Sequence, residues 1–292
     1  MSHSHDLILP FHLNGREVRG RLVRLDKVAN GILGRHDLPP AAASILGEGL
    51  ALTALIASAL KFDGIFTLQA QGDGPAGLLV ADYRNHGDLR GYIRLADDFE
   101  SRQGGPVTTL LGRGQLAFTV DPAGDSQRYQ GLVSLTGDDL ASCAEHYFAQ
   151  SDQIPTMIRL ASARGADGRW RVGGLMLQSL PRDPDSDEAE DDWRTAEALG
   201  RTVSAQELVD PSLDAADLVY RLFHEDGAWV HDTVALHDRC TCSTERVREV
   251  VRSFPQAEVE ELAQDRDAVD VDCQFCGRHY VFGLDELLGA AS

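Results

Sequence analysis

The sequence predicts an α+β protein with a mixed N-terminal domain of β-sheet and packed helices, a helical metastable linker and a small C-terminal zinc-binding module. The chain has 292 residues, and at roughly 100–200 residues per domain this length suggests about two domains. Strand-like runs and helical patterns follow one another without strict alternation, which favours α+β over a doubly wound sheet. Four of the five cysteines fall in the last 53 residues. We therefore place the N-terminal domain at residues 1–181, the linker at 182–236 and the module at 237–292.

The N-terminal domain contains five candidate strands and two candidate helices. Apolar residues recur along one side of the segment from Ile45 to Leu60, which predicts a helix that packs on another element. A second helix is expected from Asp138 to Ala149, and Cys143 within it is interpreted as a buried residue rather than a reactive thiol. The candidate strands are short apolar runs bounded by turn residues. They are residues 66–72, 77–83, 116–120, 129–135 and 170–177.

Two segments match the letters of ligand-binding motifs without the structural context that those motifs need. Gly72 to Gly77 has the glycine spacing of a dinucleotide-binding loop, but that loop must open a helix that holds the pyrophosphate. Here residues 78–81 continue as a strand, so we predict a hairpin turn. From Asp183 onward aspartates occupy loop positions of a calcium hand, but Glu188 and Arg194 stand where glycine and glutamate are required. We expect neither a nucleotide site nor a calcium site.

The linker is predicted to be only marginally stable. Residues 183–192 contain seven acids and no base, and such a run cannot bury itself, so it should be solvated or mobile. Ser204 and Glu207 have the spacing of a capping box, and Ser212 is expected to cap the next helix. That helix carries an apolar stripe that must borrow a surface from elsewhere in the chain. The stripe consists of Leu218, Val219, Leu222 and Phe223.

The C-terminal module combines two short helices with a hairpin. Ser243 is expected to cap the first helix, and Pro255 ends it before the second begins. Residues 271–282 are expected to form a tight hairpin around the second cysteine pair. A module of about 55 residues with few large apolar side chains needs an additional staple in order to fold.

The four clustered cysteines supply the ligands of a tetrahedral zinc site. They are Cys240, Cys242, Cys273 and Cys276. Residues i and i+2 of an extended segment point to the same side, so both sulfurs of the first pair can reach one ion. The second pair wraps a turn around the same ion, and Gly277 allows the backbone to close that turn. The pattern predicts one Zn²⁺ per chain. His237 and His279 are interpreted as flanking residues because four sulfurs already complete the site.

Three roles for this zinc remain open from the residues alone. Most four-cysteine zinc sites are structural. A structural zinc ribbon that binds nucleic acid needs a basic face, but residues 238–292 hold twelve acids and only six arginines. A thioredoxin-like dithiol is disfavoured because that motif opens a helix in a βαβ unit. The third role is a redox switch with local disulfides. Zinc contributes roughly 10–16 kcal/mol of folding free energy, whereas a disulfide that closes a loop of about four residues restores only about 2 kcal/mol. Oxidation would therefore unfold the module.

Composition narrows the classes of partner and the compartment. Acids outnumber bases 46 to 27, and the net charge of −19 argues against sequence-independent nucleic-acid binding and against anionic membranes. The longest apolar stretch, Gly49 to Leu60, is short of the roughly 20 residues that cross a bilayer, and no secretory signal opens the chain. No serine stands in a recognisable triad setting, and no catalytic turnover is expected. We expect a cytoplasmic protein with reduced thiols.

Beyond these patterns, the chain resembles a known family, the redox-regulated 33-kDa heat-shock chaperones of bacteria. The spacing and position of the four cysteines are similar to the zinc switch of that family. The segments Cys242–Arg246 and Cys276–Phe282, which follow the two pairs, are similar as well. Further resembling segments in the first domain are Gly47-Glu48, Leu60–Gly64, Gln71–Pro75, Glu145–Thr156 and Gly173–Pro181.

The resemblance implies a holdase chaperone that works without ATP. It implies that the reduced, zinc-bound monomer is inactive, and that oxidants form the disulfides Cys240–Cys242 and Cys273–Cys276 and release zinc. The linker then unfolds, the protein forms a homodimer, and exposed apolar surface holds unfolded client proteins. We predict that the stripe Leu218, Val219, Leu222 and Phe223 takes part in client binding. The alternatives are a thiol–disulfide oxidoreductase and a scaffold with a static structural zinc.

Overall fold

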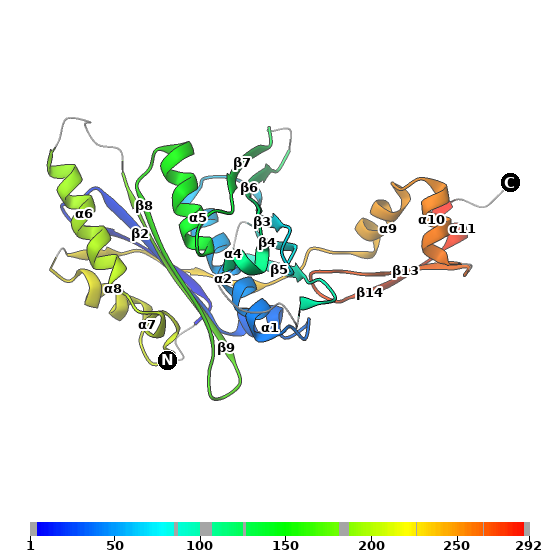
Figure 1. The fold of residues 1–292 in the computed structure, drawn as a ribbon, viewed down its shortest axis with the longest axis horizontal. Helices are drawn as coiled ribbons and strands as arrows, with labels where there is room; N and C mark the ends of the chain where they lie inside the picture. Colours follow the sequence, from blue (N-terminus) through cyan, green and yellow to red (C-terminus); the bar gives the residue numbers. More distant parts are fainter. Residues whose placement is uncertain are drawn as a thin grey trace. The chain divides into compact units, whose positions relative to one another are not determined.

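The computed structural model describes residues 5–84, 87–99, 107–124, 127–180, 187–225, 227–264 and 266–288. The chain divides into two compact units, Met1–Asp238 and Arg239–Ser292. The first unit contains two mixed layers of strands and helices, and the second contains short helices and a hairpin (Figure 1). This composition confirms the α+β class. The functional division at residues 182 and 237 stays a prediction.

Sheet A of the first unit has the strand order β10-β1-β2-β9-β8, and β11 also pairs with β1. All these pairings are antiparallel. The strands are β1 (Leu7–Leu13), β2 (Val18–Leu25), β8 (Thr156–Arg164), β9 (Trp170–Ser179), β10 (Ala228–Val230) and β11 (Val234–Ala235). Only β9 was among the predicted strands. In β1, Ile8 belongs to one core and Leu9 to another, so both faces of the sheet are covered and the alternation that marks a half-buried strand is weak.

Sheet B has the strand order β12-β5-β4-β3-β6-β7. Its strands are β3 (Gly64–Gly72), β4 (Leu78–Arg84), β5 (Asp88–Arg94), β6 (Gly114–Pro122), β7 (Tyr129–Ser134) and β12 (His237–Asp238). The segment Gly72 to Gly77 connects two antiparallel strands of this sheet, which confirms the hairpin turn. A side chain at Gly74 would lie 2.3 Å from the carbonyl oxygen of Leu110, so this glycine is required by the close approach of helix α4 (Val107–Leu111).

Helix α2 (Pro40–Ala59) lies between the two sheets and forms the centre of the main core. It begins five residues before the predicted start at Ile45, because Pro40 occupies its first turn, where the missing amide is not needed. Its 20 residues are long and apolar enough to cross a membrane by length and composition alone, and 78% of that window is buried inside the protein. The length expected for the apolar stretch was therefore too short, and the helix packs as a core element.

Helix α5 (Leu140–Tyr147) begins with a capping box between Asp139 and Ser142 and continues as a π-helix over Phe148–Asp152. The predicted helix from Asp138 to Ala149 is confirmed in position. Cys143 is 1% exposed, and burial raises the pKa of its thiol. It is a buried core residue, as predicted.

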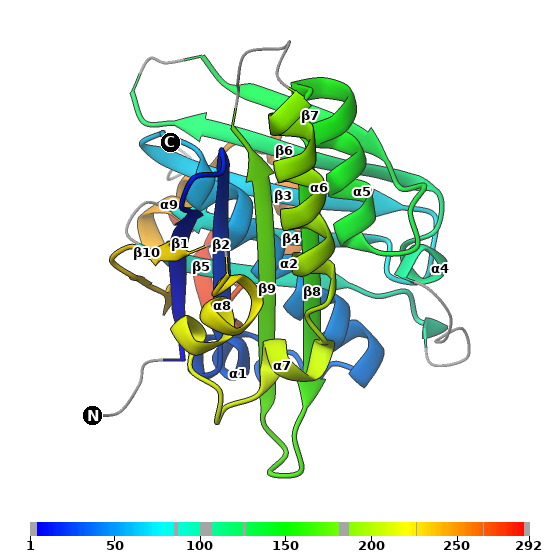
Figure 2. The same cartoon turned by 90° about the vertical axis from the view of Figure 1, so that its left-hand side faces the viewer.

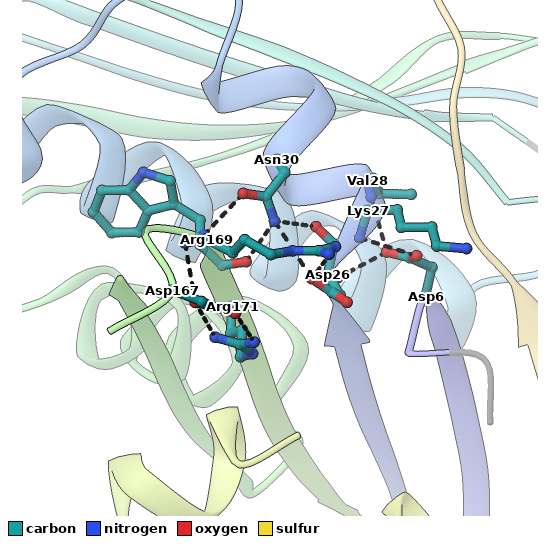
Figure 3. Close-up of polar contacts among 9 residues, drawn as sticks. Asp6, Asp26, Lys27, Val28, Asn30, Asp167, Arg169 and Arg171 are labelled. Carbon is teal, nitrogen blue, oxygen red and sulfur yellow. Dashed lines mark hydrogen bonds and ion pairs between the residues drawn. The ribbon is translucent and has the colours of Figure 1, made fainter. Parts of the chain in front are cut away.

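A polar junction fixes helix α1 (Lys27–Leu33) to the end of sheet A (Figure 3). The Asp6 carboxylate accepts hydrogen bonds from three successive backbone amides, residues 26–28, at 2.8, 3.1 and 2.9 Å. A carboxylate at a helix N-terminus satisfies free amides and complements the helix dipole. The Asn30 side chain donates to the Trp170 carbonyl at 2.7 Å and accepts from its amide at 2.9 Å. The carbonyl of Asp6 also accepts from the amide of Leu236 at 3.0 Å, so one residue joins β1, α1 and the end of the predicted linker.

The predicted linker covers one face of sheet A, which we call the outer face (Figure 2). Its helices are α6 (Asp187–Arg201), α7 (Ala205–Val209) and α8 (Ala215–Phe223). The acidic run lies partly outside the described residues at 183–186, and the remainder begins α6. Glu190 and Asp191 are exposed, as predicted, but they belong to a helix. Trp193, Ala196 and Leu199 pack on the outer face, and this apolar spacing explains the helix.

Of the two predicted caps in the linker, one is confirmed and one is wrong. Ser204 and Glu207 form the predicted capping box of α7. The cap of α8 is Asp214 rather than Ser212, because the Asp214 carboxylate accepts from the Ala216 amide at 2.8 Å. Ser212 is occupied elsewhere: its amide and hydroxyl both donate to Asp210, at 2.8 and 2.6 Å. Both residues are of capping type, and tertiary structure selects between them.

The apolar stripe of α8 packs on the outer face of sheet A, which supplies the surface that the sequence predicts this helix to need. Leu218, Val219 and Phe223 are fully buried against the outer face, and Leu222 is partly buried. The ring centroid of Phe223 lies 5.6 Å from that of Phe11.

A buried arginine of sheet A also holds the linker. The Arg24 guanidinium donates to the backbone carbonyls of Asp210 and Glu207, at 2.6 and 2.8 Å. Burial lowers the pKa of Arg24, and Asp210 and Asp214 partly oppose this. The linker is therefore docked by an apolar contact and by hydrogen bonds to its backbone.

The raised pKa of Glu48 on α2 should make the stability of the protein depend on pH. Burial, and then the charge of Asp139, raise the pKa of Glu48 to about 7, above the usual value of about 4.3 in an unfolded chain. The folded state then binds more protons than the unfolded state between these two values, so stability falls as pH rises through them. We expect Glu48→Gln to increase the free energy of unfolding at pH 8 by about 3 kcal/mol, and to change it little at pH 4.5.

Urea unfolding of both proteins at the two pH values measures this effect. Asp167→Asn is a suitable control, because Asp167 is exposed and its pKa is lowered to about 2 by hydrogen bonds from Arg171 and Arg169. If Glu48→Gln and the parent protein lose stability in parallel between pH 4.5 and pH 8, then Glu48 is not the responsible group.

Candidate metal centre

The second unit is a small module with a minimal core. It contains α9 (Thr244–Arg252), α10 (Gln256–Ala263), β13 (Ala268–Asp272), β14 (His279–Gly283) and α11 (Leu284–Leu288). The Ser243 hydroxyl accepts from the Arg246 amide at 3.2 Å, and α10 starts directly after Pro255, so both predicted helices are confirmed. The buried apolar residues are Val251, Val259, Ala263, Val269, Tyr280, Phe282 and Leu287. Such a core is too small to stabilise a fold without further help.

The four cysteines of this unit converge. Their sulfur atoms all lie within 4.8 Å of one another. The Sγ atoms of Cys240 and Cys273 are 3.8 Å apart, and those of Cys242 and Cys276 are 3.3 Å apart. Four thiolates around Zn²⁺ at about 2.3 Å in a tetrahedron are about 3.8 Å from one another. The donor set and its spacing therefore fit a single zinc ion.

Local backbone structure positions each pair. Cys240 and Cys242 lie in the extended segment that ends at the cap of α9. Cys273 and Cys276 lie in the turn between β13 and β14, and the antiparallel pairing of these strands confirms the predicted hairpin. Gly277 has φ +70°, and its amide donates to the Cys273 carbonyl at 2.8 Å. A left-handed residue closes the turn here, which glycine adopts without strain.

All four cysteines are free thiols in this structure. The nearest sulfurs belong to different pairs, since Cys240 approaches Cys273 and Cys242 approaches Cys276. A disulfide requires about 2.05 Å between sulfurs, so either pairing needs movement of the turn. The pairing Cys240–Cys242 and Cys273–Cys276 stays a prediction.

The thiols differ in how readily they ionise. Burial opposes ionisation of Cys242, but polar contacts with Tyr280 and the other three cysteines outweigh it and lower the pKa to about 7. Burial raises the pKa of Cys276 to about 12, and also raises that of Cys273. Zinc binds thiolates and releases their protons. A bound cation would therefore lower the pKa values of Cys276 and Cys273 and favour their ionised forms. Sequence analysis did not identify Tyr280, although it alternates with Phe282 in β14 on the buried side.

The neighbouring histidines are engaged elsewhere or lie in another unit. The His279 ring contacts Asp272 at 2.8 Å and Asp270 at 3.2 Å, and these carboxylates raise its pKa. His237 begins β12, in the first unit. Among the residues that the structure describes, the metal-binding group contains the four cysteines alone. The stripe that was predicted to bind clients lies in the first unit, on the side of α8 that packs against the outer face of sheet A.

Comparison with known proteins places these features in a family. A family model described as "Hsp33 protein" matches residues 6–283. A 33 kDa chaperonin of Caulobacter vibrioides is 41% identical over 283 residues, which cover 94% of each chain. Relatives of the same name from Cronobacter sakazakii and Escherichia coli are 38% and 34% identical, over 98% and 97% of this chain and 94% of each relative.

The fold agrees with a solved structure from the same group. The crystal structure of the 33 kDa chaperonin of Thermotoga maritima, a heat shock protein 33 homologue, superimposes with a TM-score of 0.82. The two sequences are 24% identical, and the match covers 98% of each chain. The fold is thus shared along the whole length, and the sequence relatives extend over the same length. The chain belongs to the Hsp33 family of 33 kDa chaperonins.

Proposed function

We propose that this chaperone is a redox-regulated holdase that prevents aggregation without ATP. Membership of the family supports the chaperone class. Redox regulation is supported by one observation: four partly exposed cysteines have their sulfur atoms within 4.8 Å of one another. Such a cluster binds one Zn²⁺ when its thiols are reduced, and it is accessible to small oxidants.

The zinc ion would be held by Cys240, Cys242, Cys273 and Cys276, and its chemistry is to cross-link the small module. Two equivalents of a peroxide such as H₂O₂ would oxidise the four cysteine thiolates to two disulfides. Each pair of thiolates gives two electrons to one peroxide, which takes up two protons from water and becomes two water molecules. Local pairing would join Cys240 to Cys242 and Cys273 to Cys276, and the disulfide sulfurs would no longer hold a metal ion. The module then loses more free energy than two short disulfide loops restore.

The linker at residues 182–236 connects this event to client binding. Its last described strand, β11, ends at Ala235, five residues before Cys240, so unfolding of the module frees the chain shortly after the docked linker. Undocking exposes the stripe Leu218, Val219, Leu222 and Phe223, together with the outer face of sheet A. Exposed apolar surface of this kind binds unfolded chains. In this proposal the reduced protein is a monomer, and the oxidised protein is a homodimer that holds unfolded clients.

The remaining elements of the proposal concern compartment and partners. The switch needs free thiols in its resting state, which is the condition of the cytoplasm. The net charge of −19 disfavours nucleic acid and anionic membranes as partners. Holding requires binding only, so no catalytic turnover is part of the mechanism.

Light scattering from a heat-unfolding client tests the proposal. The protein is added either reduced and zinc-loaded or after peroxide treatment at warm temperature. We expect only the oxidised form to suppress aggregation, with release of about one zinc per chain. Cys143→Ser should behave as the parent, because Cys143 is buried outside the metal centre. Equal behaviour of both forms would identify a static structural zinc, and steady turnover of a dithiol would identify an oxidoreductase.

A further inference from the structure

A row of polar side chains crosses sheet A on its inner face, the face that packs against α2. Strand register places His12 opposite Arg19, Arg19 opposite Gln178, and Gln178 opposite Thr156. Directly opposite residues in antiparallel strands share one face. His231, just after β10, joins the row because its Nε2 lies 2.9 Å from Nδ1 of His12. The row thus begins at the end of β10 and continues over four further strands.

Arg21 adds a second guanidinium beside this row. It lies two residues after Arg19 on β2, and alternate residues of a strand point to the same face. Val23 and Leu25, which continue this alternation, belong to the core around α2, so both arginines point inward. The sheet therefore directs two arginines and a histidine pair to one place.

Neither arginine has a carboxylate partner among the residues that the structure describes. The Arg19 side chain donates one hydrogen bond, to Oε1 of Gln178 at 3.1 Å, and the Arg21 side chain makes no hydrogen bond or ion pair with the described parts of the chain. The Nε atoms of both side chains are buried and unpartnered. Burial and the charge of Arg19 lower the pKa of Arg21 to about 10, and burial alone lowers that of Arg19. An uncompensated pair of partly buried cations is costly unless an anion accompanies it.

Two other partly buried or buried arginines of these sheets do have partners. Arg90, a partly buried arginine of sheet B, contacts the Asp82 carboxylate at 2.6 Å. Arg24, on the other face of the same strand β2, donates to two backbone carbonyls.

We propose that His12, Arg19 and Arg21 form a binding site for a phosphate-type oxyanion, either free phosphate or a phosphomonoester. Guanidinium groups donate in a fork that fits the oxygens of a phosphate group. Gln178 holds Arg19 in this row, because its Oε1 accepts from Arg19 and its Nε2 donates to the Thr156 hydroxyl at 3.4 Å. The two ring nitrogens of His12 and His231 are close enough to hold a metal cation, but the adjacent arginines repel one.

The site includes the end of the linker strand β10. His231 contacts His12 through its ring, and its amide donates to the Pro10 carbonyl at 2.9 Å. An anion bound to this row holds β10 on β1, since ligands that bind only the folded arrangement stabilise it. This inference does not depend on the proposed redox function.

Isothermal titration of the full-length reduced protein with inorganic phosphate, and separately with glycerol 3-phosphate, tests the site. Chloride is used to keep ionic strength constant. We expect saturable binding of at least one of the two, and the better ligand distinguishes free phosphate from a phosphomonoester. Arg21→Gln removes a charge-assisted donor and should weaken binding by about tenfold or more. Arg159→Gln is the matched control, because Arg159 is exposed on the other face of the same sheet, and it should bind as the parent does.

Two further measurements keep the test decisive. In phosphate-free buffer, Arg21→Gln should melt at the same temperature as the parent or higher, because it removes an uncompensated charge. Phosphate should slow hydrogen exchange of the His231 amide in the parent protein but not in Arg19→Gln. The Arg19→Gln variant therefore tests the site even if Arg21→Gln fails to fold. Absence of saturable binding, equal binding by Arg21→Gln, or equal weakening by Arg159→Gln would overturn the proposal.

Discussion

Replacing Cys276 with serine will remove zinc and ordered structure from the second unit while the first unit stays folded. Among the described residues of the second unit, seven buried apolar side chains form the core, and these cannot offset the conformational entropy of the module. A serine hydroxyl is a poor ligand in a site built for soft sulfur donors. The variant therefore loses most of the roughly 10–16 kcal/mol that a structural zinc contributes.

Amide hydrogen exchange along the full chain, with zinc quantified by a chromogenic chelator, measures both effects. Amides of α9 to α11 should lose protection, whereas those of α2 should keep it. Cys143→Ser is the matched control, because it removes a thiol from helix α5 outside the metal centre and should retain zinc. Zinc retained at one per chain by the Cys276 variant, with protected amides in the β13–β14 hairpin, would show that the cysteines are not the staple of this unit.

Truncating Phe223 to alanine will release the linker from sheet A without any oxidant. Phe223 is fully buried and its ring packs on Phe11, and truncation of a buried phenylalanine costs about 3–5 kcal/mol. The segment from α6 to α8 is an added layer on the outer face and not part of the main core. The loss of free energy therefore weakens the docking of the linker on sheet A rather than the folding of the main core. We expect faster proteolysis between residues 201 and 236, and client protection by the reduced protein.

The same helix provides a control for this effect. Tyr220 is 65% exposed on α8, and Tyr220→Ala should leave both protease resistance and the inactive reduced state unchanged. The two variants differ mainly in the burial of the ring that is removed. If reduced Phe223→Ala resists proteolysis as the parent does, the stripe is not what keeps the linker docked. If it is cleaved readily but does not protect a client, docking and client binding use different surfaces.

The metal centre was predictable from the sequence because its geometry is local. Cys240 and Cys242 share a side of one extended segment, and Cys273 and Cys276 share one turn, so spacing alone brings each pair together. Only the meeting of the two pairs is tertiary. A four-ligand metal site makes that meeting the simplest interpretation of the pattern.

Features that depend on distant parts of the chain were not predictable in this way. Helix α6 was missed because its acids dominate the composition, while Trp193, Ala196 and Leu199 become significant only when sheet A is there to receive them. Ser212 and Asp214 are both suitable caps, but Ser212 donates to Asp210, whose carbonyl accepts from Arg24 of the distant strand β2, and Asp214 caps the helix. The uncompensated arginines of β2 likewise emerge only from strand register, since their neighbours His12 and Gln178 come from different strands.

The pairing of β1 with β10 and β11 has a consequence for biosynthesis. Leu7 pairs with Ala235, so strand β1 leaves the ribosome long before one of the strands that it pairs with. The helices that cover its outer face, α6 to α8, also emerge late. Vectorial synthesis therefore exposes the apolar side chains of Leu9, Phe11 and Leu13 while most of the chain is made, and contacts between such distant segments form slowly. The nascent protein presents to its surroundings, throughout that interval, the same kind of surface that chaperones recognise.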